Sequence, residues 1–123
     1  MKRRVYYAHP MSLYNTPTER RDCQLLKDIG FEVVNPNAEP YKRAIDGLPT
    51  GMLKMQYCLG LVEECSVLAF RGLYNGEIPS GVWNEIERAR SCNIPVIELP
   101  GALLRRKLSI EETVEALAES GER

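Results

Sequence analysis

A short apolar run in the middle of the chain constrains the fold more than any other feature. Residues 65–70 read Cys-Ser-Val-Leu-Ala-Phe, an almost continuous apolar segment. The run is far too short to cross a membrane as a helix, and it is bounded by polar and charged residues. Strands that are covered on both faces have this continuous apolar character. We therefore expect residues 65–70 to form an inner strand of a parallel sheet.

The predicted elements on both sides of this run alternate between strands and helices. Further strands are predicted over residues 4–8, 31–34 and 93–99. Helices are predicted over residues 16–30, 52–64 and 80–89 and from residue 109 onward. This alternation predicts one three-layer α/β/α domain over residues 1–123, flavodoxin-like or Rossmann-like, with a four- to five-stranded, mostly parallel sheet.

Two other segments are harder to assign. Residues 35–51 are dense in Pro and Gly, and we interpret them as a long loop. Residues 103–108 are interpreted as a short edge strand. The helix starts beside them are clearer, because Thr16 to Glu19 and Ser109 to Glu112 each have the spacing of a capping box.

In an open parallel sheet, ligands bind beyond the carboxyl ends of the strands, near the point where the strand order reverses. His9 and Pro10 follow the first predicted strand, Asn35 follows the second, and Tyr41 lies in the long loop. We expect these four residues to contact a small polar ligand. The simpler alternatives are a loop-end hydrogen-bonding role for His9 and an exposed position for Tyr41.

Residues 79–89 contain the best candidate for a chemical group. Ser80 is predicted to cap the helix, and Gly81 leaves space for a ligand to approach. At about 100° per residue, Glu85 lies at the edge of the apolar stripe of this helix, whereas Glu87 points toward solvent. Glu85 is therefore predicted to be the partly buried carboxylate. An ordinary amphipathic helix with a boundary Glu is the alternative interpretation.

Composition and charge exclude several classes of protein. The chain is 44% hydrophobic and 27% charged, which is typical of a globular domain. Its net charge of −1 gives no general attraction to nucleic acid or to an anionic membrane. No segment has the length and apolarity of a membrane helix or the pattern of a signal peptide. We expect a cytoplasmic protein that binds neither nucleic acid nor membrane.

The cysteines and the single His predict no metal centre. Cys23, Cys58, Cys65 and Cys92 form no CxxC pair, and they lie within apolar segments. Buried free thiols are the usual state of such residues in a reducing compartment. One His and four scattered cysteines do not make a zinc site. We expect no metal and no cofactor. No glycine-rich dinucleotide motif or P-loop follows any predicted strand.

Several of these segments together resemble the nucleoside 2-deoxyribosyltransferase superfamily. They are Val5 to Pro10, Val33 to Pro36, the apolar run at residues 65–70, and Ser80 to Ala89 followed by Ile94 to Ile97. The resemblance extends from about Val5 to Ile97, and the order and spacing of the segments carry it. The superfamily includes N-glycosidases that cleave deoxynucleoside 5′-monophosphates, and small phage and archaeal proteins of unassigned activity.

The resemblance implies roles for three residues. The nucleophile of the superfamily matches Glu85, and the Tyr that orients it matches Tyr6 better than Tyr7. In members that act on nucleotides, a Ser at the start of the helix holds the 5′-phosphate, and that Ser matches Ser80. The implied activity is cleavage or transfer of a nucleoside or nucleoside 5′-monophosphate N-glycoside through a covalent glycosyl ester on Glu85. The superfamily also implies a homodimer.

The chain departs from the superfamily at the residues that protonate the leaving base. The aspartates used for this purpose match Cys58 and Ser66, neither of which can act as the acid. Asp46, Glu64, Glu77 and His9 are the possible substitutes, and the spacing selects none of them. The Gly that usually follows the first strand is replaced by His9. A module that binds a nucleotide or related metabolite without cleaving it, with Glu85 accepting a ribose hydroxyl, is therefore the alternative function.

Overall fold

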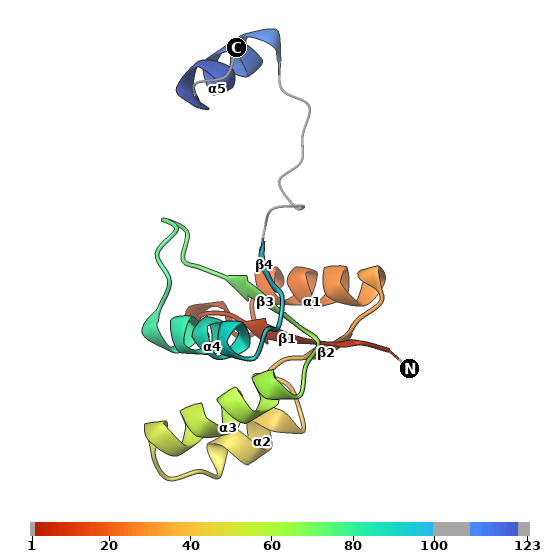
Figure 1. Cartoon of the computed structure of the whole chain (residues 1–123), viewed down its shortest axis with the longest axis vertical. Coiled ribbons are helices and arrows are strands. Elements are labelled where there is room, and N and C mark those ends of the chain that lie inside the picture. The colour runs from red at the N-terminus through yellow and green to blue at the C-terminus, as the bar shows by residue number, and fades with distance from the viewer. Residues whose placement is uncertain (1, 100–108, 121–123) are drawn as a thin grey trace.

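The computed structural model describes residues 2–99 and 109–120 (Figure 1). In these ranges the strands are β1 (Arg4–Ala8), β2 (Glu32–Val34), β3 (Val67–Arg71) and β4 (Val96–Leu99). The α-helices are α1 (Pro17–Ile29), α2 (Tyr41–Asp46), α3 (Gly51–Glu63), α4 (Ser80–Ser91) and α5 (Ile110–Ser120). A 3₁₀ turn, Met11–Leu13, follows β1.

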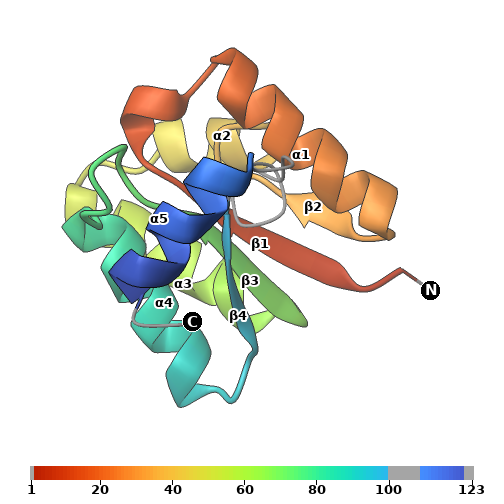
Figure 2. The same cartoon turned by 90° about the horizontal axis from the view of Figure 1, so that it is seen from above.

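The four strands form a parallel sheet in the order β2-β1-β3-β4 (Figure 2). In this register Tyr6 pairs with Val34 on one side and with Leu68 on the other. The chain moves from β1 to one edge and then returns past β1 to the other, so the strand order reverses between β1 and β3. The three-layer α/β prediction is confirmed, and the segments that follow β1 and β3 start side by side.

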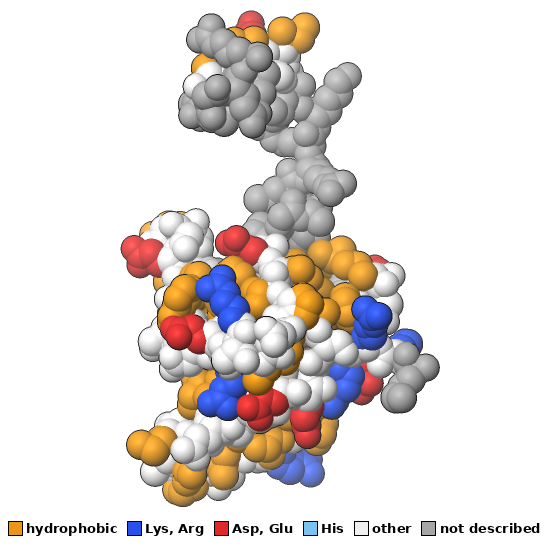
Figure 3. Space-filling model, viewed as in Figure 1, with side chains coloured by type: hydrophobic (Ala, Val, Ile, Leu, Met, Phe, Trp, Pro, Cys, Tyr) orange, Lys and Arg blue, Asp and Glu red, His pale blue; other side chains and the backbone are white. Residues whose placement is uncertain are grey.

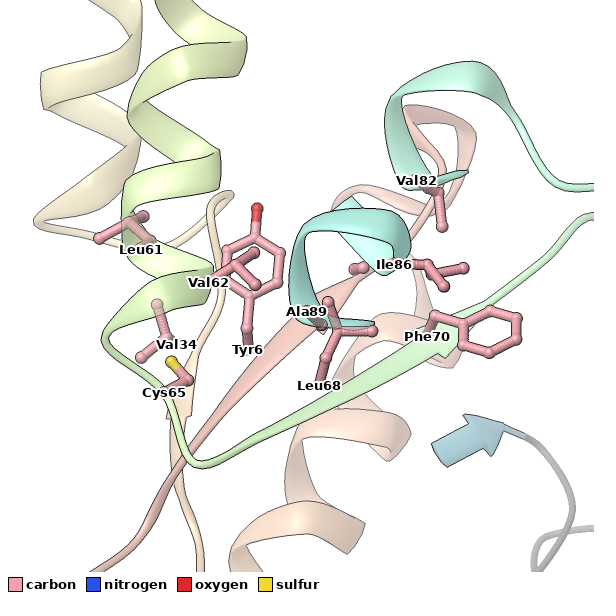
Figure 4. Close-up of a cluster of buried hydrophobic side chains, with 11 residues drawn as sticks. Tyr6, Val34, Leu61, Val62, Cys65, Leu68, Phe70, Val82, Ile86 and Ala89 are labelled. Atoms are coloured by element: carbon pink, nitrogen blue, oxygen red, sulfur yellow. The ribbon is translucent and has the colours of Figure 1, made fainter. Parts of the chain in front are cut away.

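Helices cover the sheet on both faces, with α1 on one side and α3 on the other (Figure 1). One core cluster joins β1 and β3 to α3 and α4, and Figure 4 shows Tyr6 standing between Val62 and Ala89 in it. The other cluster packs Leu26 of α1 against Val5, Tyr7, Ala69 and Leu99. Alternate residues of β1 therefore enter opposite cores, as the two-residue period of a strand requires.

Sequence signals for three helix ends work as expected. Thr16 Oγ1 accepts a hydrogen bond from Glu19 N, and Gly30 ends α1 in the left-handed region at φ 117°. At the start of α5, Glu112 N donates to Ser109 Oγ, and Ser109 N donates to Glu112 Oε1, each at 3.1 Å. This is the reciprocal pattern of a capping box.

The prediction that residues 35–51 form one loop is wrong, because they contain α2. Pro40 directly precedes this helix and Gly47 caps its end, so the residues that suggested a loop mark its two boundaries. Lys42 and Asp46 pair at 2.8 Å across one turn, which supports so short a helix. The predicted strand at residues 103–108 lies outside the described residues.

The predicted cap of α4 is also wrong. Ser80 is the first helical residue, Pro79 occupies the cap position, and no side chain caps this helix. Pro79 is already extended, at φ −59° and ψ 151°, and its carbonyl accepts from Trp83 N at 2.9 Å. Ser80 is therefore the first residue inside α4 and not its cap.

Two smaller differences concern β3 and the cysteines. Strand β3 is shifted to Val67–Arg71, because Cys65 N donates to Val62 O and completes the end of α3. All four thiols are free, but only Cys65 is buried, and Cys92 is exposed at the end of α4.

Acidic and basic side chains are interspersed on the face seen in Figure 3. Over the part of the chain that the structure describes, no helix is both long and apolar enough to cross a bilayer.

The helix starts give a direct test of this fold. Thr50 Oγ1 accepts from Leu53 N at 3.1 Å and caps α3, whereas exposed Ser80 caps nothing. Thr50→Ala is expected to lower the free energy of unfolding by about 1 kcal/mol, and Ser80→Ala to leave it almost unchanged. Urea denaturation measures both. Equal losses in the two variants would show that Ser80 caps α4 after all.

Candidate active site

A cavity of about 590 Å³ opens at the carboxyl ends of β1 and β2, beside the start of α4. Its volume falls in the range of small-molecule and cofactor sites. Five segments form its walls: the residues between β1 and α1, the loop after β2, the helix α2, the helix α3, and the start of α4. The lining residues with polar side chains are His9, Tyr14, Asn15, Asn37, Lys42, Asp46, Lys54, Cys58 and Glu85.

Glu85 is the carboxylate that α4 turns into this cavity. Its side chain is 6% exposed, whereas Glu87 on the same helix is exposed. Burial raises the pKa of Glu85 to about 7, although the hydrogen bond from Tyr6 favours the ionised form. The sequence interpretation of Glu85 as the buried carboxylate and Glu87 as the solvent-facing one is confirmed.

Tyr6 lies behind Glu85 and holds it in place. Its hydroxyl donates a hydrogen bond to Glu85 Oε2, and its side chain is fully buried between β1, α3 and α4. Burial and the neighbouring carboxylate raise the pKa of Tyr6 well above its usual value, so Tyr6 stays a donor at neutral pH. Tyr6 does not line the cavity, and it is therefore a positioning residue for Glu85.

The neighbouring Tyr7 points into the opposite core. Its hydroxyl donates to Asp22 on α1, and Asp22 in turn pairs with Arg71 at 2.6 Å and 2.7 Å. This buried network joins β1, α1 and the end of β3. The choice of Tyr6 over Tyr7 as the partner of Glu85 agrees with this placement, since adjacent strand residues face opposite sides.

His9 lines the cavity and is held by contacts of both ring nitrogens and by stacking of its ring. Its Nε2 lies 2.7 Å from Glu19 Oε2, and its Nδ1 lies 3.1 Å from Tyr7 O. The ring stacks on Tyr7 with the centroids 3.9 Å apart. Burial lowers the pKa of His9, and the bond to Glu19 opposes this effect.

Of the other predicted site residues, Pro10 and Gly81 line the cavity. A Cβ at Gly81 would lie 3.3 Å from Met55 Cε, so this glycine also allows α4 to approach α3 closely. Exposed Ser80 is not among the lining residues, although its neighbours Pro79 and Gly81 are.

Asn35 and Tyr41 lie outside the lining. Asn35 is buried behind the wall, where its Oδ1 accepts from Asn37 N at 2.9 Å. Asn35 therefore shapes the loop that presents Asn37. The hydroxyl of Tyr41 accepts a 2.7 Å hydrogen bond from Arg4, at the start of β1 and away from the cavity.

The structure narrows the choice of proton donor for a leaving base. Asp46 and His9 line the cavity, whereas Glu64 and Glu77 do not. Lys42 lowers the pKa of Asp46, so Asp46 is a carboxylate at neutral pH unless a ligand changes its surroundings. Cys58, which matches one superfamily aspartate, lines the cavity; Ser66 precedes β3 at the opposite end of the sheet.

Sequence reasoning missed Glu19, Tyr14 and Asn37. The capping-box pattern accounted for Glu19 as a helix-start residue, yet its Oε1 accepts from Asn15 N rather than from Thr16 N. Asn37 could have been proposed as a second Asn after β2, but its spacing does not distinguish it from Asn35. Among the described residues, no group of three or more His, Cys, Asp or Glu is placed to bind a metal ion.

Compared with models of known protein families the chain matches none, and compared with curated proteins it also matches none. The resemblance to the nucleoside 2-deoxyribosyltransferase superfamily therefore stays a prediction from the motifs.

The raised pKa of Glu85 predicts how stability depends on pH. The folded state holds this proton up to about pH 7, whereas the unfolded chain loses it near 4.5. The stability that Glu85 contributes is therefore present below about pH 4.5 and is lost as pH rises to about 7. Glu85→Gln avoids this loss. It should raise the free energy of unfolding over wild type by up to about 3 kcal/mol at pH 8, and by little at pH 4.

Chemical denaturation at the two pH values measures this difference. Glu87→Gln is the matched control, because Glu87 is an exposed carboxylate on the same helix. A Glu85→Gln variant with the same pH dependence as wild type would show that Glu85 is not buried as an ionisable group.

Proposed function

We propose that this chain cleaves the N-glycosidic bond of a nucleoside or nucleoside 5′-monophosphate. The single observation that carries the proposal is Glu85, a cavity-facing carboxylate oriented by the buried hydroxyl of Tyr6. A nucleophile needs a fixed direction of attack, and a hydrogen bond to one oxygen leaves the other free to react. The motifs that resemble the superfamily supply the substrate class.

In the proposed reaction, a Glu85 oxygen attacks C1′ of the sugar as the bond from C1′ to the base nitrogen breaks. The electron pair of that bond leaves with the base, which takes a proton, and a glycosyl ester of Glu85 remains. Water then hydrolyses the ester, or a second base accepts the glycosyl group. Asp46 and His9 line the cavity, but Asp46 is a carboxylate at neutral pH, so His9 is the remaining candidate from which the base would draw its proton, directly or through water.

The specific observation that favours a second function is Cys58. This thiol lines the cavity at a position where the superfamily has an acid. Burial raises the pKa of Cys58, so the thiol keeps its proton and is a poor acid for a leaving base. A non-catalytic module that binds a nucleotide or related metabolite, with Glu85 accepting a ribose hydroxyl, is therefore the alternative.

A base-release assay tests the function. Purified protein is incubated with a panel of ribo- and deoxyribonucleosides and their 5′-monophosphates, and free base is measured by chromatography. We expect release by wild type and by Glu87→Gln, and none by Glu85→Gln. Because Glu85 must be ionised to attack, kcat/KM should rise about tenfold between pH 6 and pH 8. If no substrate releases base but calorimetry detects a bound nucleotide, the chain is a binding module.

We propose further that the chain works as a homodimer in the cytoplasm, where its four cysteines remain free thiols. Met52 on α3 is 73% exposed, and Trp83 on the neighbouring α4 is 41% exposed. These two side chains lie on neighbouring helices, and an exposed apolar patch shared by two helices would be a candidate subunit contact. Light scattering at micromolar concentration should give the mass of a dimer for wild type and of a monomer for a Met52→Ser, Trp83→Ser variant. A monomeric wild type would contradict the proposal.

A further inference from the structure

Glu19 is a buried carboxylate that the proposed chemistry does not use. It projects from the first turn of α1 and is 6% exposed. Its Oε1 accepts from Asn15 N at 3.0 Å, and Asn37 Nδ2 lies 3.2 Å and 3.1 Å from its two oxygens. Its Oε2 also lies 2.7 Å from His9 Nε2. A buried carboxylate with this many nitrogen neighbours is ionised, as the lowered pKa of Glu19 also indicates.

The three partners of Glu19 come from different parts of the cavity wall. His9 directly follows β1, Asn15 ends the segment that leads to α1, and Asn37 belongs to the loop after β2. All three line the same cavity as Glu85. The Glu19 carboxylate therefore joins the segment between β1 and α1 to the loop after β2. A 3.1 Å hydrogen bond from Asn37 to Asn15 joins the same two segments directly.

The charge of His9 depends on its two partners and on its burial, which act in opposite directions. Nδ1 faces the carbonyl oxygen of Tyr7 and Nε2 faces the Glu19 carboxylate, and neither acceptor brings a proton. Only the protonated ring can donate to both, so these two contacts favour the imidazolium, whereas burial favours the neutral ring and lowers the pKa of His9 overall. The charged or titratable groups around the ring are Glu19 and Asp22 on α1, Tyr7 on β1 and Tyr14 after it. The charge of Asp22 is already matched by Arg71, which leaves Glu19 as the counter-ion of His9.

We propose that Glu19 is a positioning residue for the chemistry at Glu85. It binds His9, Asn15 and Asn37 and so fixes the wall against which the substrate lies, and its charge favours the protonated form of His9 against the effect of burial. The kinetic part of this inference rests on the proposed function, whereas the ionic contact between Glu19 and His9 does not.

Nuclear magnetic resonance of the imidazole tests the contact, since His9 is the only histidine of the chain. In Glu19→Gln the amide keeps the shape of the side chain but provides no negative charge for an imidazolium. The His9 ring should therefore titrate at a clearly lower pH in Glu19→Gln than in wild type. Asp28→Asn, which removes an exposed carboxylate of α1, should leave the titration unchanged. Identical titration of wild type and Glu19→Gln would overturn the inference.

Steady-state kinetics with the best substrate of the base-release panel test the positioning role. Glu19→Gln should raise KM about tenfold, the effect expected when hydrogen bonds to a charged group are lost. Its kcat should fall only as far as His9 supplies the proton of the leaving base, because Tyr6 and Glu85 are untouched. An unchanged KM would overturn the role.

Asn37→Ala is the second variant if Glu19→Gln does not fold. It removes one partner and keeps the contact between Glu19 and His9, so it should raise KM without moving the His9 titration. An unchanged KM or a shifted titration in Asn37→Ala would count against the proposal. If wild type releases no base at all, the proposed function and the positioning role fall together, and the imidazole titration still decides the ionic contact separately.

Discussion

The hydrogen bond from Tyr6 to Glu85 is the interaction on which the site depends. It joins β1 in the middle of the sheet to α4, which follows β3, and so it crosses the point where the strand order reverses. The buried ring of Tyr6 is fixed by the core around it, and its hydroxyl directs a carboxylate that would otherwise be costly to bury. The same packing that holds Tyr6 in the core therefore also orients the Glu85 carboxylate.

A second polar arrangement supports the cavity from the other face of β1. Tyr7 stacks on His9 and bonds to Asp22, and Glu19 gathers His9 with residues from two loops. Neighbouring residues in β1 and directly after it therefore serve different purposes: Tyr6 orients the carboxylate, and Tyr7 and His9 organise the wall. This division follows from the alternation of side chains along a strand. It also explains why a histidine is accommodated directly after β1, since a carboxylate on α1 stands opposite it.

Local sequence patterns were enough to predict the parallel sheet and the burial of Glu85. The apolar run at residues 65–70 and the alternation of elements predicted the parallel sheet, and the helical stripe of α4 separated Glu85 from Glu87. The failures concern contacts between distant segments. No spacing shows that the Glu19 carboxylate turns to His9 and Asn37, because a capping box accounts for it locally. Tyr41 was expected at the cavity, but α2 turns its hydroxyl toward Arg4. Ser80 was expected to cap α4, but Pro79 occupies the cap position and Ser80 is the first helical residue.

The most direct test of the central claim, that Glu85 is a nucleophile, is to trap the glycosyl enzyme. A 2′-fluoro analogue of the best substrate slows the second step, because fluorine destabilises the oxocarbenium-like transition state. After acid quenching, intact mass spectrometry should show one added fluoropentosyl or fluoropentosyl phosphate group. Peptide mapping should place this group on Glu85. Release of base without any adduct, or an adduct on another residue, would contradict the account.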